Sequence, residues 1–216
     1  MRSQPRPTKD KIVAMRLPPV FLAAFLAMNL PLAAAPDTWT YWIQPCTPEA
    51  ARSTNCEAAD SQLAVWALEG WEKASDGRIA MKPARDKEEA RLRVFWAGGN
   101  LHLYGETRPI DVNGRRGAEL YILPDLAALG DQIAKAGSGD KLYRDTVVYL
   151  TCLHESGHAL GLPHNQNFED IMYSFQYGGD IVEYFARYRR KLLAREDIRR
   201  NSGLNAGDAK LLAGSR

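Results

Sequence analysis

Apolar residues recur at helical spacing in three stretches of the chain, 60–73, 141–160 and 181–193, and we expect an amphipathic helix in each. The first follows the capping residue Asp60 and ends before an Asp-Gly turn. The second is apolar at so many positions that it should lie deep in the core. The third carries a basic side, which indicates a solvated helix face rather than a binding patch.

Alternating apolar and polar residues predict three strands, at 78–82, 90–96 and 118–123. The segments between them are rich in turn residues. We expect irregular structure over 37–60, which holds two prolines and two cysteines, and a glycine-rich loop before the third strand, around Gly105, Gly114 and Gly117. The length of 216 residues favours a single domain, and a hydrophobic share of 45% supplies enough material for a core.

The first 35 residues differ in character from the rest. Basic residues up to Arg16 precede an apolar stretch at 20–30 and small residues that end at Ala35. This order is typical of a secretory signal peptide, and we expect an exported protein, periplasmic or released to the medium. Pro36 disfavours cleavage directly after Ala35, which leaves the cleavage position open. The apolar run is short for a transmembrane helix, and the alternative is an uncleaved membrane anchor.

Removing this leader changes the charge balance. The whole chain has a formal net charge of +2, but residues 36–216 hold 23 basic and 25 acidic groups. We therefore expect no nucleic-acid partner and, unless the signal stays uncleaved, no stable membrane association. We expect 36–216 to be one domain and a monomer.

Three cysteines fall in the mature part. Export implies an oxidising compartment, so we expect Cys46 and Cys56 to form a disulfide that closes a short loop. Cys152 lies inside the long apolar helix and is expected to be a buried free thiol.

Three of the four histidines fall within the segment His154-Glu-Ser-Gly-His158-Ala-Leu-Gly161-Leu-Pro-His164. Residues four apart lie on the same side of a helix, so His154 and His158 can bind one metal ion. Gly161 can end the helix in a left-handed conformation, and the chain can then turn back to bring His164 to the same ion. Three imidazoles and one water describe a catalytic zinc site, with Glu155 as the general base for the zinc-bound water.

This spacing is the signature of the metzincin peptidases, and the chain resembles their matrixin branch over roughly residues 60–200. Asp170-Ile-Met172-Tyr173 resembles the Met-turn of the clan, in which the methionine forms an apolar floor under the metal. Arg195-Glu-Asp-Ile198 resembles the start of the last helix. Asn165 and Ser174 depart from the residues that are common in the branch.

The resemblance implies an α+β fold of the metzincin type. A twisted, mostly parallel sheet would pack on two long helices. A lobe up to about residue 161 would carry the catalytic helix, and a smaller lobe, 162–216, would carry His164 and the Met-turn. An extended substrate would lie along an edge strand near 118–123. We expect a specificity pocket beside His154, lined by Phe175 and Tyr177.

The resemblance also bears on cofactors and regulation. In zymogens of the family a cysteine can block the metal, which makes this role the alternative for Cys46. The one remaining histidine, His102, is too little for the second, structural zinc that many matrixins carry. Bound calcium stays open, because backbone carbonyl ligands leave no sequence pattern.

The sequence therefore predicts a secreted zinc endopeptidase that acts on protein or peptide substrates. Two other functions stay open. The chain could be an exported zinc-binding module that holds protein partners without catalysis, or a zinc hydrolase that acts on a non-peptide bond.

Overall fold

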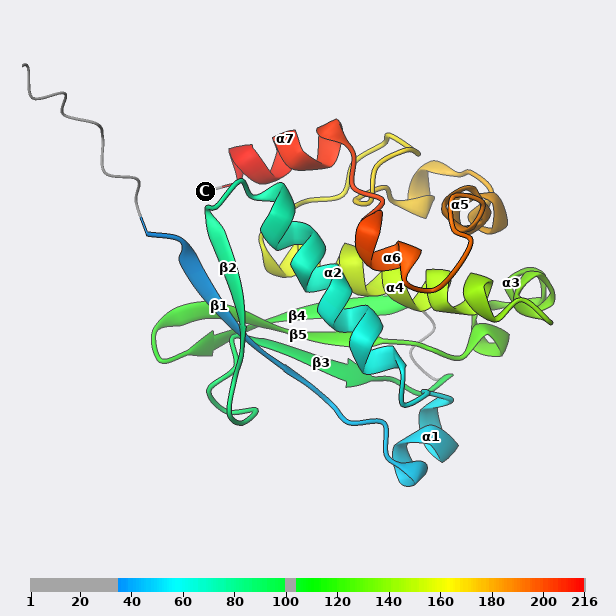
Figure 1. Ribbon diagram of the computed structural model, residues 1–216, viewed down its shortest axis with the longest axis horizontal. Helices are drawn as coiled ribbons and strands as arrows, with labels where there is room; N and C mark the ends of the chain where they lie inside the picture. Colours follow the sequence, from blue (N-terminus) through cyan, green and yellow to red (C-terminus); the bar gives the residue numbers. More distant parts are fainter. Residues whose placement is uncertain (1–34, 100–103, 216) are drawn as a thin grey trace, which may run out of the picture. The chain divides into compact units, whose positions relative to one another are not determined.

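Five strands form one mixed sheet in the order β2-β1-β3-β5-β4 (Figure 1). The computed structural model describes residues 35–99 and 104–215, so residues 1–34 of the expected signal peptide and His102 lie outside it. Neighbouring strands are parallel except β4 and β5, which are antiparallel. The strands are β1 Asp37–Ile43, β2 Ile79–Pro83, β3 Leu92–Trp96, β4 Gly105–Val112 and β5 Arg115–Ile122.

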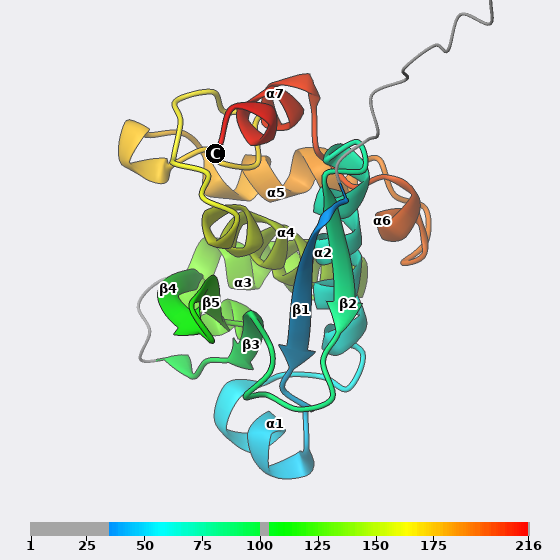
Figure 2. The ribbon, with the colours of Figure 1, turned by 90° about the vertical axis from the view of Figure 1, so that its left-hand side faces the viewer.

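Helices cover one face of this sheet. Two long helices, α2 and α4, lie side by side against it, and α5 and α7 lie beyond them (Figures 1 and 2). None of the helices in the described residues has the length and apolar character needed to cross a bilayer. The helices are α1 Pro48–Thr54, α2 Asp60–Ala74, α3 Asp131–Gly137, α4 Lys141–Ala159, α5 Ile181–Arg189, α6 Asp197–Arg200 and α7 Ala206–Gly214, with short 3-10 turns η2 Leu126–Leu129 and η3 Phe175–Tyr177.

The core lies between the sheet and the two long helices. Alternate residues of β3 and β5 point into it, which is the pattern of a half-buried strand. Trp71 of α2 is completely buried, and its indole N–H donates to the backbone carbonyl of Leu153 in α4 at 2.8 Å. This bond fixes α2 to the turn of α4 that comes just before His154. The α+β fold with a mixed sheet on two long helices is confirmed.

The prediction of irregular structure over 37–60 was wrong in two places. Residues 37–43 form β1, which lies between β2 and β3 in the sheet. Residues 48–54 form α1, whose first turn is capped by the side chain of Thr47. The prolines and cysteines of this segment lie mainly between these elements, and their turn character hid the alternation of Asp-Thr-Trp-Thr-Tyr-Trp-Ile.

The prediction of a glycine-rich loop before the third strand was also wrong. Residues 105–122 form a β-hairpin whose turn is Asn113-Gly114, both with positive φ (55° and 74°), as a two-residue turn of this kind requires. Strand β4 contains charged residues and Pro109 because it is an edge strand, where such residues protect the sheet against further pairing. Its composition therefore lacks the apolar alternation of an inner strand.

At its C-terminal end the chain departs from the resemblance as well. The segment around Arg195–Ile198 leads into α6, which has only four residues. The last helix in the described residues is α7, which is preceded by a capping box in which Asn205 and Asp208 bond to each other's backbone.

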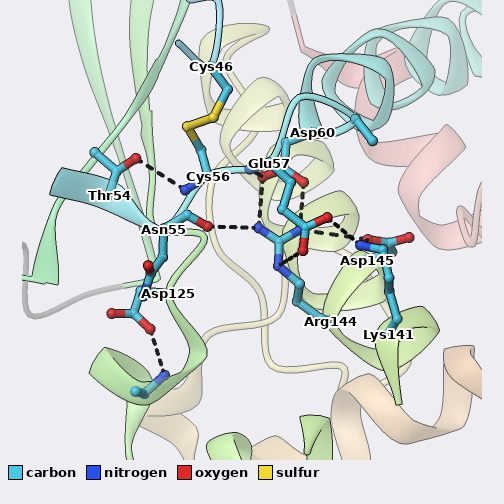
Figure 3. A network of polar contacts seen from close by, with 12 residues as sticks. Cys46, Thr54, Asn55, Cys56, Glu57, Asp60, Asp125, Lys141, Arg144 and Asp145 are labelled. Carbon is cyan, nitrogen blue, oxygen red and sulfur yellow. Dashed lines mark hydrogen bonds and ion pairs between the residues drawn. A yellow bond between two sulfur atoms is a disulfide. The ribbon is translucent and has the colours of Figure 1, made fainter. Parts of the chain in front are cut away.

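Ion pairs tie the beginning of α2 to the beginning of α4, and a disulfide closes the loop that holds α1 (Figure 3). The predicted disulfide Cys46–Cys56 is present, which removes Cys46 as a free thiol that could block a metal. Asp60, expected as a cap, is the first helical residue of α2. Its carboxylate accepts two hydrogen bonds from Arg144, at 2.6 and 2.8 Å. Cys152 is free and buried, as expected.

Candidate metal centre

Helix α4 carries two of the candidate ligands on one side. The helix ends at Ala159 with Leu160 as its cap, and Gly161 follows with φ +97°, a conformation that favours glycine. The N–H of Leu162 then donates to the carbonyl of Gly157 at 3.0 Å, which closes the reversal of the chain. This reversal carries His164 back toward His154 and His158.

The three Nε2 atoms converge. His164 Nε2 lies 3.1 Å from that of His154 and 3.0 Å from that of His158. His154 is buried, His158 half-buried and His164 exposed, so the group lies at the surface end of a hollow. The three side chains together form the group of potential metal ligands in the described residues.

In His154 and His158, a hydrogen bond made by Nδ1 determines that Nε2 is the nitrogen free to bind a metal. His154 Nδ1–H donates to the carbonyl of Ile171 at 2.7 Å, and His158 Nδ1–H donates to that of Leu162 at 2.8 Å. A carbonyl can only accept, so both rings carry their proton on Nδ1 and present a lone pair at Nε2. These lone pairs and Nε2 of His164 meet at one point, where a single cation can be bound by all three rings. The donor set therefore fits zinc.

The charge state of the rings agrees with this. Burial lowers the pKa of His154 to about 3, and it also lowers the pKa values of His158 and His164. The imidazoles are therefore neutral at pH 7, which is the form that binds metal.

Glu155 lies between α4 and the edge strand β4. Only 3% of the residue is exposed, and burial is the main reason why its pKa is raised to about 7. The hydroxyl of Thr107 donates to its Oε2 at 2.6 Å and lies 2.9 Å from its backbone carbonyl. A Cβ at Gly105 would lie 2.6 Å from Oε1, so only glycine lets β4 come this close to the carboxylate.

Met172 is completely buried below the turn of α4 that joins the two helical histidines. A Cβ at Gly157 would lie only 2.4 Å from its sulfur and 3.0 Å from Trp71 Cζ2. Gly157 is therefore the residue that lets the methionine pack against the helix between His154 and His158. The methionine fills the space below the ligands as an apolar contact.

The segment that holds Met172 is anchored by two buried carboxylates. Asp170 accepts hydrogen bonds from three amide side chains: Asn165 at 2.9 Å, Asn167 at 2.6 Å and Asn205 at 2.8 Å. Asp208 of α7 accepts from the N–H of Ile171 at 2.9 Å. The departure Asn165 is thus part of the support of the Met-turn, and α7 connects this turn to the end of the chain.

A hollow of about 460 Å³ opens in front of the histidines and Glu155. Tyr104, Thr107 and Phe175 line it, and the rings of Tyr104 and Phe175 pack edge to face with centroids 5.9 Å apart. Tyr177 is not among its lining residues, and 49% of it is exposed. The strand along this hollow is β4, whereas 118–123 coincides with the inner strand β5, so the predicted position of the edge strand was wrong.

A larger hollow, about 760 Å³, lies at the other end of α4 and lacks comparable chemistry. Its cations are already paired, Arg144 with Asp60 and Lys141 with Glu57 (Figure 3).

Residues 34–182 match the matrixin family model, which describes peptidase family M10, and this span includes all three histidines and Met172. The chain belongs to the matrixin family. No curated protein matches its sequence. Family membership makes this matrixin a zinc metallopeptidase in general terms, and the predicted branch is confirmed.

Sequence reasoning found the histidines, Glu155 and Met172 of this matrixin, and the structure brings them together. It missed three residues that support them: Gly157, Thr107 and Tyr104. Gly157 was visible as the glycine of the histidine motif, but its contact with Met172 was not. Thr107 and Tyr104 belong to a segment that was expected to be a loop, and no pattern in the chain indicates their roles.

Proposed function

We propose that this matrixin is an exported zinc endopeptidase in which Glu155 is the general base. One observation carries the proposal. Three neutral ring nitrogens converge beside a buried carboxylate, in a hollow that runs along the free edge of a sheet.

The three histidines and Glu155 have different roles in the proposed reaction. His154, His158 and His164 would hold a zinc ion, which when bound supplies a Lewis acid that acidifies water and polarises a peptide carbonyl. Glu155 takes the proton of the attacking water and delivers it to the leaving amine. In the metal-free site burial raises the pKa of this carboxylate, so it takes up a proton more readily than an exposed glutamate.

Thr107 is a positioning residue for this base. Its hydroxyl has two acceptors within reach, Oε2 of Glu155 and the backbone carbonyl of Glu155. With the carboxylate ionised, the hydroxyl donates to Oε2. Once Oε2 has gained a proton, the hydroxyl can accept a hydrogen bond from Oε2–H and donate its own hydrogen to the carbonyl. Thr107 can therefore hold the group in one orientation throughout the transfer.

The substrate is an extended peptide that adds to the outer edge of β4. This strand pairs with β5 on one side, and no described strand pairs with it on the other. Backbone groups of an edge strand bind a peptide irrespective of its sequence, and pockets select its side chains. Tyr104 and Phe175 form the apolar wall of the hollow, so an apolar side chain is expected next to the scissile bond.

The test combines metal analysis with cleavage of a peptide library and a denatured protein. The purified mature chain should hold one zinc per molecule and cut internal peptide bonds, and a chelator should abolish cleavage until zinc is restored. His158→Ala should lose the metal and part of the stability, because the folded state no longer gains free energy from binding. Unchanged zinc stoichiometry in that variant would show that the ligand assignment is wrong.

Two results would favour the other functions. Stoichiometric zinc with no cleavage of any peptide or protein would indicate a binding module. Release of products from ester or cell-wall substrates, with peptides left intact, would indicate a hydrolase of another bond.

A further inference from the structure

A second hollow, of about 350 Å³, continues the first along β4. The two share Thr107 and His158, and the second also reaches Pro109 and Arg116. The side chains of Thr107 and Pro109 lie on the same face of the strand, since they are two residues apart. A peptide lying along β4 would therefore pass the first hollow and then the second.

Arg116 differs from the other arginines of the neighbouring strands. Arg93, Arg108 and Arg115 each form an ion pair, with Glu119, Glu106 and Asp37 respectively. For Arg116 no carboxylate of the described residues lies within ion-pair distance, and the side chain is exposed.

The residue that could neutralise Arg116 is engaged elsewhere. Asp111 stands directly opposite Arg116 in the β4–β5 ladder. Its Oδ1 accepts from the N–H of Gly114 at 2.8 Å and so stabilises the hairpin turn. The guanidinium of Arg116 instead lies beside Gly161, where an added Cβ would be 2.9 Å from Nη1.

One contact gives Arg116 a structural role. Its Nη2 donates to the backbone carbonyl of His158 at 3.4 Å, and a cation at the C-terminal end of a helix is favourable. This long bond uses one of five N–H groups. The remaining donors are free for a ligand in the second hollow.

We propose that Arg116 selects substrates with an acidic side chain in the second hollow. The inference rests on the proposed peptidase function and names the substrate class, an extended peptide with an apolar residue at one hollow and Asp or Glu at the other. The guanidinium matches the planar, bidentate geometry of a carboxylate. The two hollows adjoin at Thr107, the residue that positions Glu155, so the two side chains should lie on opposite sides of the scissile bond.

The test is a set of peptides, capped at both ends, that share one apolar residue and carry Glu, Gln or Lys at each neighbouring position in turn. The zinc-loaded protein should cut the Glu peptide about fivefold more efficiently than the Gln peptide at one position, since a partly exposed ion pair contributes little more than this. The ratio should fall as salt is added. A second set with free C-termini shows whether a terminal carboxylate substitutes for the side chain.

Arg116→Gln should bring the Glu-to-Gln ratio close to one, and Arg116→Glu should reverse the preference toward Lys. The ratio is independent of overall damage, because a disturbed helix end would slow both peptides alike. Arg108→Gln is the matched control, since Arg108 lies on the same edge strand but pairs with Glu106, and its ratio should match that of the wild type.

Three outcomes separate the two proposals. Cleavage without an acidic preference, or with a preference that Arg116→Gln retains, overturns the role of Arg116 and leaves the peptidase intact. Cleavage of no peptide overturns the peptidase. In that case, tighter binding of the Glu peptide, measured by fluorescence anisotropy and lost in Arg116→Gln, would still support the charge selection.

Discussion

The two ends of helix α4 use polar residues in opposite ways. At its N-terminal end Arg144 pairs with Asp60 (Figure 3), and Asp145 pairs with Arg195 at 3.0 Å, so each of these charges has a partner of opposite sign. At its C-terminal end the histidines bond to carbonyls through one nitrogen and leave the other facing its neighbours. Paired charges stabilise the packing of the elements that carry them. Unpaired nitrogen lone pairs that converge on one point can instead bind a ligand such as a metal ion.

The largest effect is expected for a substitution at the histidine end of α4 that removes a reactive group without changing the size of the side chain. Glu155→Gln should lower kcat/KM about 10³-fold, because general-base catalysis is lost while size and zinc ligands are kept. Activity is measured on the best peptide and zinc by elemental analysis. Full turnover in this variant would contradict the mechanism, and loss of zinc would show that the substitution disturbs more than the base.

At the N-terminal end of α4, where the charges are paired, a substitution should lower stability and leave activity unchanged. Asp60→Asn should lower the free energy of unfolding by about 3 kcal/mol, because it leaves the largely buried Arg144 without its bidentate partner. The folded variant should keep wild-type kcat and zinc, since the pair lies two to three helical turns from His154. Urea unfolding gives the stability. The matched control is Glu183→Gln, an exposed partner of Arg190, which should leave stability nearly unchanged. A large loss of kcat in Asp60→Asn would show that the two ends are coupled.

Gly157→Ala tests whether close packing below the ligands is required. The added methyl group would overlap the sulfur of Met172, and we expect a loss of about 2 kcal/mol in stability together with weaker zinc binding. The better helix propensity of alanine offsets part of this loss. Gly214→Ala in α7, where no atom lies within 4 Å of the added Cβ, is the control and should not be destabilising. Equal behaviour of the two variants would remove the packing argument.

Gly157 also shows which part of the metal centre could be predicted from the sequence and which part could not. Helical spacing and the positions of three histidines and one glycine predicted the centre, because ligands on one helix follow from its geometry alone. The residues that support the centre come from other elements. Met172 was located by resemblance, but its contact with Gly157 depends on the packing of α4 against the following loop, which no local pattern records.

The sheet shows the same division. Strand β3 was predicted, since its buried positions alternate with half-buried ones. Strand β4 was not, because an edge strand in contact with solvent contains the residues of a loop. The error had a consequence for the site, since β4 contributes Thr107 and Gly105 and lies along the hollow where β5 was expected. The edge that we propose binds the substrate is thus a strand whose sequence is not typical of a strand.

Thr107→Val gives the smallest and most specific effect. Valine keeps the shape and strand propensity of threonine but removes the hydroxyl that donates to Glu155 at 2.6 Å. One hydrogen bond to a charged group that can still reorient contributes about 1 kcal/mol, so kcat should fall about fivefold while KM and zinc content stay unchanged. Thr107→Ser should restore kcat, since it keeps the hydroxyl and loses only the methyl group. If Thr107 served only to pack β4 against α4, valine would be harmless and serine would be the damaging substitution.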